Sequence, residues 1–120
     1  MQKKENDALP KADPEAKQAP YQIARRAEMN SESLFKPPFS KALKAGKVIL
    51  QPGESIGEHV TEKREEAIIV LRGTATLLLE GKTIQLSQGQ ALYIGPEKKH
   101  DVKNNSSQEL EYVYVVALLE

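Results

Sequence analysis

Residues 53–73 read GESIGEHVTEKREEAIIVLRG, and this stretch decides the fold of the chain. It holds two short strand-like segments, each with a glycine at one end, as is typical of β-strands joined by turns. Successive side chains of a strand point to opposite faces, so Glu66, Ile68 and Val70 are expected on one face of the second segment. His59 lies on the first segment. If the two faces line one interior, His59 and Glu66 converge.

The same rhythm continues to the C-terminus. Short runs rich in Val, Ile, Leu and Tyr alternate with turn residues, which predicts an all-β sandwich or barrel rather than βαβ units. The expected strands are 41–50, 57–61, 66–71, 75–79, 82–86, 91–94, 100–103 and 110–118. The expected core consists of alternate apolar side chains: Val48, Leu50, Ile68, Val70, Leu77, Leu79, Ile84, Leu92, Val113 and Val115.

The N-terminal part has a different composition. All seven glycines lie at Gly46 or later, and five of the seven prolines lie at Pro38 or earlier. Residues 1–20 are charged and nearly free of large aliphatic side chains, so they cannot offset their ordering entropy and are predicted to form a disordered tail. Residues 21–39 are predicted to be an arm that packs on the main body. Ile23, Ala27 and Leu34 are compatible with a weak helix, and residues 21–23 are equally compatible with an edge strand. Residues 40–120 are predicted to be the barrel domain.

Composition excludes several classes of function. The chain has no cysteine, so disulfides and thiolate metal sites are ruled out. Lys plus Arg equals Asp plus Glu at 17 each, and no basic stripe is visible, so a nucleic-acid partner is not expected. No apolar run approaches the ~20 residues of a membrane span, and no leader pattern is present. A cytoplasmic location without membrane contact is therefore expected.

Metal-ligand residue types are few. The two histidines of the chain, His59 and His100, each follow a glycine turn and fall on an expected strand. Two imidazoles with the carboxylate of Glu66 suit non-haem Fe(II), and zinc with three protein ligands and a water fits equally well. Manganese and nickel also fit. Glu65 would be the inward carboxylate if the strand register slipped by one residue.

The spacing of these residues resembles the two motifs of the cupins. Seven positions fall in register, four in the first motif and three in the second: Gly53, His59, Glu66 and Gly73, then Gly89, His100 and Asn104. Thr61 stands where the family has a second metal histidine. The resemblance covers residues 53–104 in its motifs and about 40–118 with the flanking strands. It implies a double-stranded β-helix, a divalent transition metal held by His59, Glu66 and His100, and a small-molecule ligand at the barrel mouth.

The resemblance also has implications for function. It implies a metal-binding cupin that binds or transforms a small organic molecule; an enzyme of this kind would be a metal-dependent oxygenase, isomerase or lyase. Because Thr61 replaces a ligand, a metal-free ligand-binding module and a dimeric scaffold without catalysis stay open. Thr61 is expected to be a neutral replacement rather than a catalytic group, and a hydrogen bond to a metal-bound water is the role that its hydroxyl could take. Tyr93, Tyr112 and Tyr114 are expected to pack in the barrel, and those that face inward would lie against a ligand. A homodimer formed through residues 21–39 is also implied.

Overall fold

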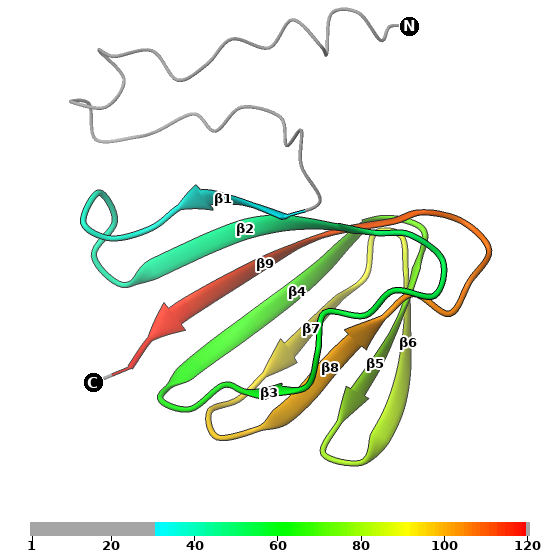
Figure 1. The fold of residues 1–120 in the computed structure, drawn as a ribbon. Helices are drawn as coiled ribbons and strands as arrows, with labels where there is room; N and C mark the ends of the chain where they lie inside the picture. The colour runs from blue at the N-terminus through cyan, green and yellow to red at the C-terminus, as the bar shows by residue number, and fades with distance from the viewer. Residues whose placement is uncertain (1–30, 120) are drawn as a thin grey trace, which may run out of the picture.

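The computed structural model describes residues 31–119, and these form nine β-strands and no helix (Figure 1). The all-β fold expected from the sequence is confirmed. The strands are β1 (Ser31–Phe35), β2 (Leu43–Leu50), β3 (His59–Val60), β4 (Arg64–Arg72), β5 (Thr74–Leu79), β6 (Lys82–Ser87), β7 (Ala91–Ile94), β8 (Lys99–Lys103) and β9 (Leu110–Leu118). Among the described residues, no helix is long and apolar enough to cross a membrane.

The strands form two antiparallel sheets. One has the order β1-β2-β9-β4-β7, and the other has the order β3-β8-β5-β6. From β2 to β9 the chain crosses repeatedly from one sheet to the other, and these crossings can be followed by colour in Figure 1. This alternation produces the double-stranded β-helix that the resemblance to the cupins implies. It also brings segments far apart in the sequence, such as β3 and β8, into direct hydrogen-bonded contact.

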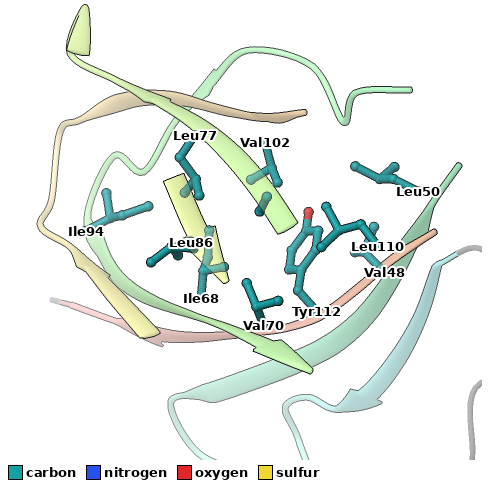
Figure 2. Packing of buried hydrophobic residues seen from close by; sticks show 11 residues of the cluster. Val48, Leu50, Ile68, Val70, Leu77, Leu86, Ile94, Val102, Leu110 and Tyr112 are labelled. Atoms are coloured by element: carbon teal, nitrogen blue, oxygen red, sulfur yellow. The ribbon is translucent and has the colours of Figure 1, made fainter. Parts of the chain in front are cut away.

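The core lies between the inner faces of the two sheets (Figure 2). Five of the ten core residues expected from the sequence are buried, and Leu79, Ile84 and Leu92 are partly buried against them. Val113 and Val115 are wrong as core residues. On β9 the inward positions are taken by Leu110 and Tyr112 instead. The buried set includes Val48, Leu50, Ile68, Val70, Leu77, Leu86, Ile94, Val102, Leu110 and Tyr112.

A charged residue marks the outer face of β9. The Glu111 carboxylate forms ion pairs with Nζ of Lys47 at 3.3 Å and with the guanidinium of Arg72 at 2.9 Å, both on the outer face of the sheet. Because alternate residues share a face, Val113 and Val115 lie on the same outer side as Glu111. Both faces of this strand are apolar in sequence, so alternation alone does not identify the inner one. In the structure, Glu111 and its ion pairs lie on the outer face, and the buried Leu110 and Tyr112 lie on the inner one.

The first described strand, β1, forms the edge of the five-stranded sheet. It pairs antiparallel with β2, with Ser31 opposite Val48. Residues 31–35 are therefore a strand and not the end of a weak helix, whereas the edge strand expected at residues 21–23 lies outside the described residues. The expected tail over residues 1–20 and the rest of the arm up to residue 30 lie outside the described residues.

Asn104 joins the ends of several strands. Its side-chain amide is fully buried and donates to the carbonyl oxygens of Leu50 at 2.9 Å and Gln108 at 2.8 Å. Its side-chain oxygen accepts from the backbone N–H of Ser106 at 3.0 Å and from the hydroxyl of the same residue. The side chain thus fixes the end of β2 and the β8–β9 loop together.

Candidate metal centre

Three strands from both sheets supply the candidate ligands. His59 on β3 lies directly opposite His100 on β8 in the antiparallel register, and their ring centroids are 4.1 Å apart. Glu66 comes from β4 in the facing sheet, where it pairs with Ile94 and Val116. One ligand atom from each of the three side chains lies within 4.8 Å of the others. The residues that the sequence singles out therefore meet in space.

Backbone carbonyls orient both imidazoles. Nδ1 of His59 lies 2.9 Å from the carbonyl oxygen of Gly57, and Nδ1 of His100 lies 3.3 Å from that of Lys98. A carbonyl oxygen only accepts hydrogen bonds, so Nδ1 carries the proton in each neutral ring. Nε2 is then the nitrogen with a free lone pair. This tautomer is the one that a metal ligand bound through Nε2 requires.

Two members of the cluster formed by His59, Glu66 and His100 are shielded from solvent. His100 is 1% exposed, and the side chain of Glu66 is 11% exposed, whereas His59 is exposed. Nε2 of His100 lies 3.3 Å from Oε1 of Glu66, which is an ion-pair distance, but the two atoms are not aligned for a hydrogen bond. A buried nitrogen without a hydrogen-bond partner is costly, and a bound cation would satisfy it.

The electrostatics of His100 point the same way. Burial is the largest influence and lowers its pKa, but the Glu66 carboxylate, the Lys98 carbonyl and the charge of Asp101 outweigh it, so that the pKa is raised above 6.5. The surroundings of Nε2 therefore favour positive charge there. A metal cation between the imidazole and the carboxylate would supply that charge in place of a proton. The two-histidine, one-carboxylate donor set fits iron, zinc, manganese or nickel.

Thr61, which stands where the cupin pattern has a histidine, is 4% exposed and is engaged with the backbone. Its hydroxyl donates to the carbonyl oxygen of Gly95 at 2.8 Å and accepts from the N–H of Lys98 at 2.9 Å. The single hydroxyl proton is directed at Gly95, so none is left for donation to a metal-bound water. The side chain instead ties the end of β3 to the β7–β8 loop.

The three tyrosines occupy different environments. Tyr114 faces a cavity beside the cluster, and burial, together with the negative charge of Glu66, raises its pKa. Tyr112 is buried in the core, where its hydroxyl has no hydrogen-bond partner and burial raises its pKa strongly. Tyr93 is wrong as a pocket residue. It is 62% exposed because it alternates outward on β7, and its hydroxyl donates to Glu65 at 2.8 Å.

That contact also settles the register of β4. Glu65 lies on the outer face with Tyr93, and Glu66 points inward, as preferred in the sequence analysis.

A cavity of about 240 Å³ opens beside the cluster. His59, Thr61, Glu66 and Tyr114 line it. Two cationic side chains that the sequence analysis missed, Lys44 and Arg64, line it as well. Their strand positions could have identified them. Lys44 is four residues from inward Val48 on β2, and Arg64 is two residues from inward Glu66 on β4, so each shares the inward face.

The fold and the site together define a β-barrel protein with a histidine–carboxylate cluster beside a small open cavity. The family model of the cupin domain matches residues 46–116, which is more than half of the chain. The chain belongs to the cupin family. The matched range falls within the barrel domain expected from residue 40 onward, whose boundaries stay a prediction.

The chain is also similar to individual proteins and to a solved structure. The chain is 33% identical over 69 residues to the polyketide synthase CurC of Streptomyces cyaneus, covering 58% of this chain and 45% of that protein. It is 28% identical over 80 residues to the oxalate-binding protein of Thermotoga maritima, covering 67% and 66%. The chain thus spans about half to two thirds of these relatives. A crystal structure of a cupin protein from Bacteroides fragilis superposes with a TM-score of 0.73 at 20% identity, covering 82% and 84%.

Proposed function

We propose that this chain is a metal-binding cupin that holds one divalent transition metal at His59, Glu66 and His100 and binds a small organic molecule in the adjoining cavity. The convergence of the three ligand atoms within 4.8 Å carries the proposal. The buried, unpartnered Nε2 of His100 supports it. A metal at this position would act as a Lewis acid on an oxygen of the bound molecule.

The protein side chains have separate parts in this proposal. His100 and Glu66 form the buried side of the site, and the Lys98 carbonyl fixes the His100 ring. His59 forms the exposed side, toward the cavity opening. Because the ligands must be deprotonated, metal affinity is expected to fall in mild acid. A small organic ligand is consistent with the cavity volume and with the name of the oxalate-binding relative.

Elemental analysis of the purified protein, prepared without chelator, tests the metal. Wild type is expected to carry about one equivalent, and metal addition is expected to raise its thermal stability. Glu66→Gln and His100→Ala should lose both. Glu65→Gln is the matched control, because it changes the adjacent carboxylate on the outer face and should keep the metal. Well under one equivalent in wild type, with no stabilisation by added metal, contradicts the proposal.

A metal-free ligand-binding module is the second candidate, and one observation favours it. Thr61 occupies the position of a family ligand, and its hydroxyl is fully engaged with the backbone. This candidate predicts that small molecules bind equally well with and without added metal. Comparing ligand binding by the protein prepared with and without metal therefore distinguishes this candidate from the metal-binding one.

A homodimer is a further proposal. It is supported by membership of the cupin family, whose small members commonly form dimers through N-terminal strands, and by β1, which is a strand of the N-terminal arm. Light scattering on the full chain would give twice the mass of one chain, 13.3 kDa. A monomer across the accessible concentration range contradicts it.

A further inference from the structure

We propose that the cavity beside the cluster selects a small carboxylate, and that Lys44 and Arg64 are the residues that recognise its negative charge. This inference rests on the proposed function, since it concerns the ligand of the same cavity. It starts from two cationic side chains that are not among the candidate metal ligands His59, Glu66 and His100.

The sheet register places both cations on the ligand side. Lys44 is directly opposite Val116 on β9, and Glu66 is opposite the same residue from β4. Directly paired residues of neighbouring strands share a face, so Lys44, Val116 and Glu66 form a row on the inner face of the sheet. Arg64 precedes Glu66 by two residues and therefore lies on that face as well. Both cations line the cavity.

Neither cation is neutralised within residues 31–119. The ion pairs found there involve Lys47, Arg72 and His100, but not Lys44 or Arg64. Lys44 is partly buried, and a partly buried charge without a partner is unfavourable. An anion in the cavity would remove this cost.

The charge balance of the cavity favours an anion. Glu66 is the single carboxylate among the described residues that line it, and it faces two fixed cations. A divalent metal at the cluster would increase the positive excess. Clefts lined by charge of one sign concentrate ligands of the opposite sign.

The shape of the cavity restricts the ligand further. A cavity of about 240 Å³ lies below the ~300–1,000 Å³ of typical pockets for drug-sized ligands, so a molecule of a few carbon atoms suits it. Arg64 can bind a carboxylate with two parallel hydrogen bonds, and Lys44 adds a point charge. The remaining wall includes Val48, Ile56 and Val116, which would contact a short carbon chain.

Isothermal titration calorimetry on the full chain tests the inference. The probes are oxalate, pyruvate and succinate, each compared with its uncharged amide. At least one carboxylate is expected to bind more tightly than its amide, with an affinity that falls as salt is added. Lys44→Met and Arg64→Met should each weaken that binding roughly 10- to 100-fold, the range for a lost charge-assisted hydrogen bond.

Controls keep this test separate from that of the metal. Lys47→Met removes a cation from the outer face of the same strand and should bind the carboxylate like wild type. Metal content is measured before and after titration, because oxalate can extract metals; it should be the same in Lys44→Met, Arg64→Met and wild type.

Two outcomes would overturn the inference: no carboxylate binds better than its amide, or both variants bind it as wild type does. Absence of metal from every preparation would instead contradict the proposed function, and carboxylate binding lost in the two variants would still support these residues as the anion site.

Discussion

Replacing Gly73 by alanine should destabilise the fold more than the same change at two matched glycines. Gly53, Gly73 and Gly89 have φ angles of +89°, +88° and +86°, so all three share a left-handed conformation that a β-carbon disfavours. A β-carbon at Gly53 or Gly89 would meet no atom within 4 Å. At Gly73 it would lie 2.5 Å from the carbonyl oxygen of Glu109 and 3.0 Å from the α-carbon of Leu110.

The magnitude follows from two separate effects. The left-handed conformation costs a non-glycine residue roughly 1–2 kcal/mol, which is the expected loss in Gly53→Ala and Gly89→Ala. In Gly73→Ala the overlapping atoms belong to the backbone and cannot be cleared by a rotamer change. Forcing extra volume into a packed site typically costs another ~1–3 kcal/mol. Because the φ angles match, the difference between Gly73→Ala and Gly89→Ala isolates the overlap.

Urea unfolding followed by far-ultraviolet circular dichroism measures this difference, since the chain has no tryptophan to report by fluorescence. The m-values of the variants should agree, so that the midpoints can be compared. If Gly73→Ala and Gly89→Ala lose the same free energy of unfolding to within about 0.5 kcal/mol, the close approach of Gly73 to the Glu109–Leu110 backbone is wrong. Folded Gly73→Ala should keep its metal, because Leu110 lies at the opposite end of β9 from Val116 and Glu66.

Two further predictions test contacts around the barrel. Asn104→Ala should lower the free energy of unfolding by roughly 2–4 kcal/mol, since it leaves buried backbone groups unsatisfied, whereas exposed Asn105→Ala should change it by less than about 0.5 kcal/mol in the same urea assay. Gly46→Ala would place a β-carbon 2.5 Å from Cζ of Tyr114, so it should cost about 1–3 kcal/mol and reduce the near-ultraviolet tyrosine signal; an unchanged signal contradicts the packing of that ring on β2.

Much of the fold could be predicted because its determinants are local. Turn glycines and apolar alternation locate the strands, and Glu66 rather than Glu65 faces inward because Ile68 and Val70 share its phase. The order of strands in the sheets is not local. That His59 lies opposite His100 depends on β3 pairing with β8, which is 40 residues further along the chain, and only the family resemblance indicated it before the structure.

The errors have a common physical origin. Where both faces of a strand are apolar or aromatic, alternation does not say which face is inside. Val113 and Val115 were placed in the core for this reason, and Tyr93 in the pocket. For Lys44 and Arg64 the sequence alone gives no prediction, because a charged side chain suggests solvent although both residues have the inward phase. Departures from the hydrophobic pattern are expected at functional sites, so polarity is a poor guide to side-chain orientation there.

Thr61 connects the departure from the cupin motif to the remaining ligands. The Lys98 N–H donates to its hydroxyl at 2.9 Å, and its own N–H donates to the Lys98 carbonyl oxygen at 3.0 Å. The same carbonyl oxygen lies 3.3 Å from Nδ1 of His100 and so fixes the tautomer that frees Nε2. A histidine at position 61 would keep the backbone N–H contact but lose the hydroxyl contacts to the Lys98 N–H and the Gly95 carbonyl oxygen. The threonine is therefore more than a missing ligand, because its hydroxyl anchors Lys98, the residue whose carbonyl oxygen orients a retained histidine.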